Sequence, residues 1–343
     1  DLDAGHILGS NIIELWIEED DKKLKFVFSG DLGNGNQPIV KDPAIIENAD
    51  YVILETTYGS RYHKDINRRV EKLREVIDAT MRKGGNLIIP SFAVERTQDL
   101  LYDLNDLYSQ GLLSSNIDVY IDSPLAIAAT EIFHKHTEYY DDETRQLVES
   151  GEHPLEIPNL KFSRTQQESM ELNKIKGNTI IISASGMCDA GRIKHHLKHN
   201  LWRPESTILL VGYQAEGTLG RRIAEGEKLV KIHGEQVAVK AEIKSIEAYS
   251  AHADRAGLLS WLKNFVVPPR GIFLVHGEEE SQLSLSDAIK EELNIPVYIP
   301  EWLEKVELKP SESLLAEKPI APDNIEKAIL AEKLYLEFRV KLN

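Results

Sequence analysis

The stretch NTIIISASG, residues 178–186, followed by RIKHHLKHNL, residues 192–201, contains the pattern that decides the fold. A short run of isoleucines between polar and small residues is typical of a strand that is buried on both faces. The second stretch has the periodicity of a helix. A strand that leads directly into a helix is the building unit of α/β proteins with parallel strands.

The same strand-then-helix unit recurs along the chain, at residues 86–108, 118–136, 206–226, 243–265 and 271–293. Before the first of these units, the apolar stretches NIIELWIEE and LKFVFSGD flank the polar turn EDDKK, which predicts a β-hairpin. The stretch YVILETTYG predicts a further strand. The sequence therefore predicts an α/β protein with largely parallel, buried strands.

The composition restricts the class of protein. The chain has 343 residues, 42% of them hydrophobic, which is enough for two globular domains. It contains no apolar run of the ~18 to 20 residues that a membrane span needs and no signal sequence, and Cys188 is its only cysteine. We therefore expect a cytoplasmic protein without a membrane partner. The net charge of −16 argues against a protein that coats nucleic acid non-specifically.

Polar residues follow several of the predicted strands directly. In parallel α/β sheets the ligand lies beyond the carboxyl ends of the strands, where the next helix begins. One polar residue at such a place is commonly a helix cap or a turn former. Together, these residues predict a cleft: Asp31, Ser91, Asp122, Ser185, Tyr213, His252 and His276.

Two histidines and an aspartate form a candidate metal site. His6, Asp31 and His276 offer imidazole and carboxylate groups, which Zn²⁺ binds when thiolates are absent. Each lies next to or near a glycine, which allows close approach of the backbone. The spacing by itself is not specific, because a single histidine after a strand is more often a hydrogen-bonded structural residue.

The sequence motifs around these residues resemble those of a known protein family. DAGHILGS and SGDLG are similar to the third and fourth metal motifs of the metallo-β-lactamase superfamily. The similarity continues, in the family's order, through ETTYG, PSFAVERTQDLL, SASGMCDAGRIKHHL, GYQAEGTLGRR, AYSAHAD and LVHGE. These motifs resemble the β-CASP group of RNA-processing nucleases, and the resemblance covers roughly residues 1 to 310.

The resemblance implies a fold with two parts. Residues 1–60 and 245–315 are expected to form a metallo-β-lactamase αββα sandwich that is incomplete at its N-terminus. Residues 61–244 are expected to form an inserted β-CASP α/β domain of mainly parallel strands. Residues 316–343 have helical periodicity and are expected to form a C-terminal helical tail.

The resemblance also implies a function and roles for individual residues. It implies a zinc-dependent ribonuclease, endonucleolytic or exonucleolytic, that cleaves single-stranded RNA through a hydroxide bridging two Zn²⁺ ions. His6, Asp31 and His276 would be metal ligands, with Asp31 bridging. His252 would donate a proton to the leaving oxygen, and Glu55 would orient His252. An interior salt bridge between Glu55 and His252 is the alternative interpretation.

One departure from the family bears on activity. The main metal motif of the family, His-x-His-x-Asp-His, does not occur in this sequence. Since that motif precedes the third one, we expect the chain to begin inside the fold. His6, Asp31 and His276 then supply only part of a two-zinc site, so an empty or singly occupied site is expected. The first hairpin is expected to have an uncovered sheet face and edge.

Short donors at strand ends and helix starts are candidates for binding phosphate. The set comprises Ser91, Arg96, Ser183, Ser185 and Ser250. Ser185 and Gly186 are expected to begin the helix of Arg192, because serine at an N-cap with glycine beside it suits an anion. The alternative is that these serines only cap their helices.

Two other functions remain open. The missing ligands allow a non-catalytic β-CASP protein that binds RNA or serves as a scaffold. A small-molecule metallo-hydrolase is disfavoured, because the resemblance implies that such enzymes lack the inserted domain. The partner implied by the resemblance is single-stranded RNA, and a homodimer is one candidate assembly.

Overall fold

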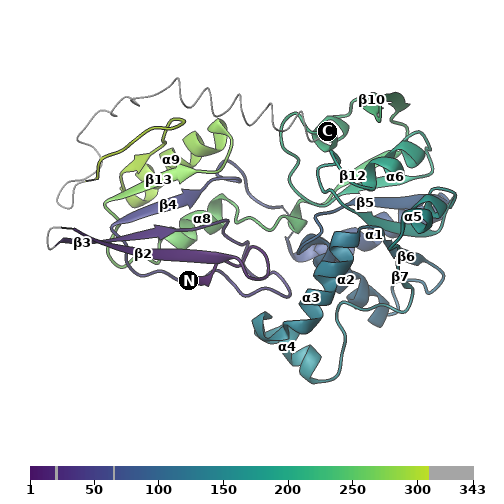
Figure 1. The fold of residues 1–343 in the computed structure, drawn as a ribbon, viewed down its shortest axis with the longest axis horizontal. Helices are drawn as coiled ribbons and strands as arrows, with labels where there is room; N and C mark the ends of the chain where they lie inside the picture. Colours follow the sequence, from purple (N-terminus) through teal and green to yellow (C-terminus); the bar gives the residue numbers. More distant parts are fainter. Residues whose placement is uncertain (20–21, 65, 309–343) are drawn as a thin grey trace.

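The computed structural model describes residues 1–19, 22–64 and 66–308. They form two lobes that stand side by side, and each lobe contains a six-stranded sheet (Figure 1). The predicted tail at residues 316–343 lies outside the described residues. Within the described part, no helix is both long enough and apolar enough to cross a bilayer.

The first sheet has the strand order β1-β2-β3-β4-β13-β14. Its strands are β1 (Leu2–Asp3), β2 (Asn11–Glu19), β3 (Lys22–Phe28), β4 (Tyr51–Glu55), β13 (Gly271–Val275) and β14 (Val297–Tyr298). The antiparallel pair of β2 and β3 confirms the predicted hairpin, with Ile13 opposite Phe28 and Glu19 opposite Lys22. The strands β3, β4, β13 and β14 are parallel to their neighbours.

The two faces of this sheet are covered differently. Helices α8 (Arg255–Leu262) and α9 (Glu279–Leu293) pack in one core cluster with the inward residues of β2, β3, β4 and β13. On the other face, alternate residues of β2 point away from that core, and Ile13, Leu15 and Ile17 are 48%, 44% and 46% exposed. Within the described residues the β2 half of this face is therefore open, as predicted, whereas Leu24 of β3 on the same face is buried and β1 covers the start of the β2 edge.

The second sheet is entirely parallel, with the strand order β12-β9-β5-β8-β6-β7. Its strands are β5 (Asn86–Pro90), β6 (Asp118–Ile121), β7 (Leu160–Phe162), β8 (Thr179–Ser183), β9 (Thr207–Leu210) and β12 (Glu242–Ser245). All residues of β5, β8 and β9 are buried, which explains their continuous apolar runs. The predicted parallel, buried sheet is confirmed.

Helices cover both faces of the second sheet. One core cluster joins it to α1 and α2, and another joins its opposite face to α6 and α7. The helices of this lobe are α1 (Arg69–Arg82), α2 (Arg96–Ser109), α3 (Pro124–Lys135), α4 (Asp142–Glu149), α5 (Gln166–Leu172), α6 (Ile193–Asn200) and α7 (Leu219–Ala224). Short 3₁₀ helices lie at Ile66–Arg68, Thr137–Tyr139 and Glu247–Tyr249, and β10 (Leu229–Ile232) forms a hairpin with β11 (Glu235–Ala238).

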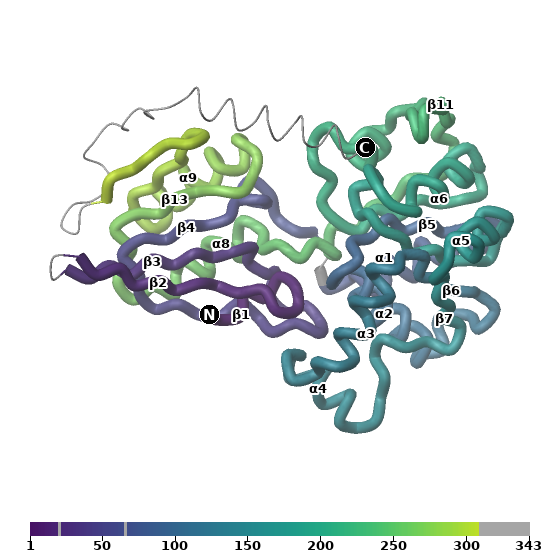
Figure 2. Tube along the Cα trace, viewed as in Figure 1, coloured from purple at the N-terminus to yellow at the C-terminus, as the bar shows by residue number. Residues whose placement is uncertain are grey.

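The second lobe is inserted between two adjacent strands of the first. β4 and β13 are parallel neighbours, with Tyr51 opposite Gly271 and Glu55 opposite Val275. Figure 2 shows the resulting arrangement, in which the purple and yellow-green ends of the described chain share one lobe. The domain boundaries at residues 60, 244 and 315 stay predictions. The last strand of the second sheet, β12, ends at Ser245, one residue after the predicted boundary at 244.

Candidate active site

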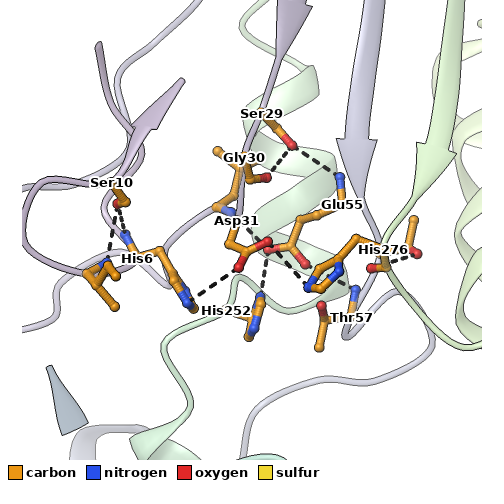
Figure 3. Close-up of polar contacts among 12 residues, drawn as sticks. His6, Ser10, Ser29, Gly30, Asp31, Glu55, Thr57, His252 and His276 are labelled. Carbon is orange, nitrogen blue, oxygen red and sulfur yellow. Dashed lines mark hydrogen bonds and ion pairs between the residues drawn. The ribbon is translucent and has the colours of Figure 1, made fainter. Parts of the chain in front are cut away.

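The carboxyl ends of three neighbouring strands place the central residues of the site. Because β3, β4 and β13 are parallel, their ends meet at one edge of the first sheet. Asp31 follows β3 after two residues, Glu55 is the last residue of β4, and His276 directly follows β13. Their side chains lie close together, and those of His6 and His252 join them from two loops (Figure 3).

Asp31 lies between two histidines. Its Oδ2 atom is 3.8 Å from His6 Nε2, and its Oδ1 atom is 3.4 Å from His276 Nε2. The loop that carries His6 is fixed by the backbone N–H of His6, which donates to Ser10 Oγ at 3.2 Å. The structure thus brings together the three residues predicted as metal ligands, and each histidine faces a different oxygen of Asp31.

The buried Glu55 is paired with the partly buried His252. The Oε1 atom of Glu55 lies 2.9 Å from His252 Nδ1 and also accepts from the backbone N–H of Leu32 at 2.9 Å. Its Oε2 atom accepts from the backbone N–H of Thr57 at 3.1 Å. Since an ionised carboxylate only accepts hydrogen bonds, Nδ1 of His252 carries the proton and Nε2 is left for another partner.

The loop of His252 is held on both sides. The backbone N–H of Ala253 donates to the carbonyl of Leu32 at 2.7 Å. On the other side, Nε2 of His63 lies 2.9 Å from the carbonyl oxygen of His252. His63 therefore supports the loop of His252 through the backbone instead of joining the cluster around Asp31.

His6 is suited to be a neutral ligand. Burial and, to a smaller extent, the neighbouring His252 together lower its pKa to about 4, although the carboxylates of Asp31 and Glu55 oppose the shift. Its Nδ1 atom is buried and makes no hydrogen bond within the described residues. An unprotonated imidazole is the form that binds metals, so His6 needs to release no proton at neutral pH.

The cluster fits a metal ion by its donor chemistry. His6, Asp31 and His252 each offer a ligand atom within 4.8 Å of the others. Imidazole and carboxylate groups without thiolate are donors that zinc binds, and Nδ1 of His6 is a buried nitrogen without a hydrogen bond among the described residues. His252 has two interpretations in this geometry, as a ligand and as a proton donor.

A cavity of about 450 Å³ opens beside these residues, between the two lobes. Its lining includes Arg96 and Ser250 from the predicted phosphate set. The guanidinium of Arg96 is paired with Asp99 at 2.5 Å. Ser91 and Ser183 are buried outside this lining, and Ser183 Oγ donates to the carbonyl of Asp122 at 2.7 Å.

The predicted N-cap role of Ser185 is wrong. Helix α6 begins at Ile193, and Arg192 is its N-cap residue. Ser185 instead closes a small loop, because its backbone N–H donates to the carbonyl of Ala190 at 3.1 Å and its Oγ accepts from the N–H of Ala190 at 3.3 Å. This loop separates strand β8 from the helix, so Ser185 is too far from the first turn to cap it.

Asp122 is a structural residue of the second lobe. Its side chain is buried and accepts from Arg192 at 2.7 Å and from His196 and Ser169 at 2.6 Å. Burial alone would raise its pKa, but the hydrogen bonds from His196 and Ser169 outweigh burial and hold the pKa at about 2. Asp122, which follows β6, therefore holds the start of α6 and does not line the cavity beside His6.

Two contacts across the lobes escaped the sequence analysis. Glu95 Oε2 accepts from the backbone N–H of Leu8 at 2.7 Å, and the hydroxyl of Tyr213 donates to Glu278. Glu95 and Glu278 lie within stretches that resemble family motifs, PSFAVERTQDLL and LVHGE. Their place in these motifs could have marked both glutamates as functional candidates. The sequence does not show, however, which group each carboxylate contacts.

The chain matches two family models. A Beta-Casp domain matches residues 97–223, and a Zn-dependent metallo-hydrolase RNA specificity domain matches residues 236–300.

Several proteins with similar sequences are named as RNA-cleaving or RNA-related proteins. A ribonuclease of Thermus thermophilus is 36% identical over 282 residues, covering 82% of this chain and 63% of the relative. An RNase J-like protein of Methanocaldococcus jannaschii is 34% identical, covering 87% and 68%. Transcription termination factor FttA of the same organism is 31% identical, covering 89% and 49%. The chain thus spans about half to two thirds of these relatives.

The fold and the site define an α/β protein of the metallo-β-lactamase type, with a second α/β unit inserted between two strands of its sheet. The chain belongs to the β-CASP family of metallo-β-lactamase RNases.

Proposed function

We propose that the chain acts as a zinc-dependent ribonuclease that hydrolyses phosphodiester bonds of single-stranded RNA. The observation that supports this function most directly is the position of the Glu55–His252 pair beside His6, Asp31 and His276. Metal-binding groups and a hydrogen-bonded imidazole thus meet at one end of a cavity. Similarity to proteins named as ribonucleases supports the same substrate.

His6, Asp31 and His276 are the residues that would hold zinc, with two ions in a complete site. Zinc supplies Lewis-acid chemistry, which activates water and offsets the negative charge of a phosphate. Asp31 suits a shared position, because its two oxygens face different histidines.

His252 would supply a proton to the leaving oxygen of the cleaved phosphodiester. This role requires the doubly protonated imidazolium form of His252, in which Nδ1–H donates to Glu55 and Nε2–H passes its proton to the leaving oxygen. Glu55 would act as a positioning residue, since its three hydrogen bonds fix its own carboxylate within the sheet edge. Ser250 and Arg96 line the cavity where the phosphate chain would pass.

A second function is compatible with one feature of the site. Among the described residues, His6, Asp31, His252 and His276 meet there, which is fewer donors than two zinc ions ordinarily take. A β-CASP protein that binds RNA or a processing partner without cleaving it would be compatible with such a site.

One experiment separates the two functions. A fluorescent single-stranded RNA is incubated with the purified protein, with chelator, and with chelator followed by zinc. We expect cleavage that chelator abolishes and zinc restores, and that Asp31→Asn loses. His136→Ala is the matched control, because His136 is a half-exposed histidine that pairs with Glu138 at the surface. RNA binding without chelator-sensitive cleavage would instead support the non-catalytic function.

We also propose a cytoplasmic location. The chain has one cysteine, Cys188, which is buried, so no disulfide can form within the chain, as is usual in a reducing compartment. Fractionation of cells that express the protein tests the location, and light scattering of the purified protein tests for a homodimer.

A further inference from the structure

One wall of the cavity beside the metal cluster is apolar and open to solvent. Phe92, Val94 and Leu125 line it and are 43%, 37% and 65% exposed. Met187 and Tyr213 complete this wall. Adjacent apolar side chains that stay exposed in a cavity commonly mark a binding site.

Phe92 is held in place by its own backbone. It follows strand β5, and the preceding residue, Ser91, extends the ladder by donating its N–H to the carbonyl of Ser183 at 3.0 Å. The carbonyl of Phe92 accepts from Thr97 Oγ1 at 2.7 Å, and the carbonyl of Ala93 accepts from Gln98 Nε2 at 3.3 Å. The backbone that carries the ring is therefore held by hydrogen bonds on both sides of Phe92.

The ring rests against backbone. A Cβ atom at Gly186 would lie 2.8 Å from Cδ2 and 2.9 Å from Cε2 of Phe92, so only glycine allows the ring this close. One edge of the ring is thus supported by the loop after β8, and much of the rest faces the cavity. The result is a flat, rigid apolar surface within the same cavity as His6, Asp31 and His252.

We infer that Phe92 is a stacking platform for one nucleobase of single-stranded RNA, next to the phosphate that is cleaved. This inference rests on the proposed ribonuclease function and adds to it a subsite for a base. Every nucleobase has a flat π-face, so a phenyl ring binds it without regard to sequence. Val94, Leu125 and Met187 enclose the edge of the base.

The charge of the protein favours such a platform. A chain with a net charge of −16 obtains little affinity from neutralising phosphates along a basic groove. The guanidinium of Arg96, which lines the cavity, is already paired with Asp99. Stacking on Phe92 supplies affinity for RNA that does not depend on positive charge.

The test measures binding separately from cleavage. Single-stranded RNA that carries 2-aminopurine at one position, moved along the strand in a series, is titrated with the full chain in the presence of chelator. At one position, stacking should quench the fluorescence. Replacing that nucleotide by an abasic one should weaken binding by roughly 5- to 150-fold.

The variants identify the residue responsible. Phe92→Ala and Phe92→Leu should lose the quenching, and removal of the base should then have little further effect on binding. Phe92→Trp should keep both properties. Phe162→Ala is the matched control, because Phe162 is a phenylalanine of similar exposure, 40%, at the end of β7 and outside the cavity. Far-ultraviolet circular dichroism and thermal melting check that each variant is folded.

The outcomes separate the subsite from the proposed function. If the wild-type protein binds and cleaves RNA but a folded Phe92→Ala variant keeps the quenching and the abasic effect, the platform is refuted and the ribonuclease stands. If Phe92→Ala binds every RNA as tightly as wild type, the apolar wall serves another ligand, such as a protein segment, and the inference fails. Absence of both RNA binding and RNA cleavage by the wild-type chain, with zinc as well as with chelator, would overturn both.

Discussion

The carboxylate of Glu95 accepts a hydrogen bond from the backbone N–H of Leu8 at 2.7 Å, across 87 residues of sequence. Leu8 lies in the loop that carries His6, whereas Glu95 lies in the other lobe, directly before α2. Glu95 is itself buried and has a φ of 69°, a conformation that residues other than glycine seldom adopt. The inserted lobe thus helps to fix the loop of His6, which we propose as a metal ligand.

Glu95→Ala should weaken zinc binding by roughly 10- to 100-fold, because groups that orient a metal ligand commonly contribute that much to affinity. Loss of the acceptor also leaves the N–H of Leu8 without its partner. Isothermal titration with zinc measures the effect, and Glu95→Gln is the control, since its amide oxygen still accepts. A Glu95→Ala variant with unchanged zinc affinity would show that the loop of His6 is held by other contacts.

His252→Ala should lower RNA turnover by roughly 10² to 10⁴-fold while the zinc content stays near that of wild type. Glu55→Gln should lower turnover less, because it keeps the position of the ring but weakens the hydrogen bond at Nδ1. Turnover of a fluorescent RNA and metal analysis are measured on the same samples. Parallel loss of zinc from His252→Ala would make His252 a ligand, the other interpretation that its distance to His6 and Asp31 allows.

Zinc should bind tightly at about one ion per chain. The described residues bring together His6, Asp31, His252 and His276, whereas each catalytic zinc ordinarily has about three protein ligands. Metal analysis after gel filtration gives the ratio, and His6→Ala should abolish tight binding while His136→Ala should leave it intact. Two tightly bound ions per chain would contradict this prediction and would require donors outside the cluster.

The stability of the protein should fall between about pH 4 and pH 7 because of Asp99. Burial raises its pKa from 3.8 to about 6, opposed by the charges of Arg96 and Arg69 and reinforced by that of Asp103. A pKa raised on folding contributes stability below the unfolded value, and this contribution, up to about 3 kcal/mol, is lost as the pH rises through 6. Urea unfolding at several pH values measures the slope.

Asp99→Asn should make that slope shallower, because the amide does not ionise. Asp142→Asn is its control, since the side chain of Asp142 is 83% exposed on α4. An equal pH dependence in wild type and Asp99→Asn would assign the effect to another buried group, with Glu95 the first to examine, because burial also raises its pKa.

Much of the fold was predictable because its signals are local. Buried parallel strands produce short apolar runs, and β5, β8 and β9 lie where those runs occur. The meeting of Asp31, Glu55 and His276 also follows from parallel strands that end at one edge. The strand ends are visible within a few residues of sequence, whereas the pairing of β4 with the distant β13 was expected only from the family resemblance.

The rest depends on contacts between distant segments. The partner of Glu95 is a backbone group in the other lobe, and no local pattern marks it. The start of α6 was misplaced because Ser185 and Gly186 resemble a helix N-terminus, whereas the chain forms a loop that ends at Gly191 with a φ of 79°. The position of the Phe92 ring was equally hidden, since it depends on the close approach of Gly186, which is distant in the sequence.

The insertion of one lobe between β4 and β13 also orders the events of synthesis. Thr56 Oγ1 donates to the carbonyl of Val275 at 3.0 Å, and 219 residues separate the two. At about 5 to 20 residues per second, a ribosome takes roughly 10 to 40 s to make the intervening chain. The inserted sheet has all its strands before β13 emerges, so it can fold while β4 still waits for its neighbour. In the nascent chain, the cluster of Asp31, Glu55 and His276 therefore cannot assemble until translation of the sheet is nearly over.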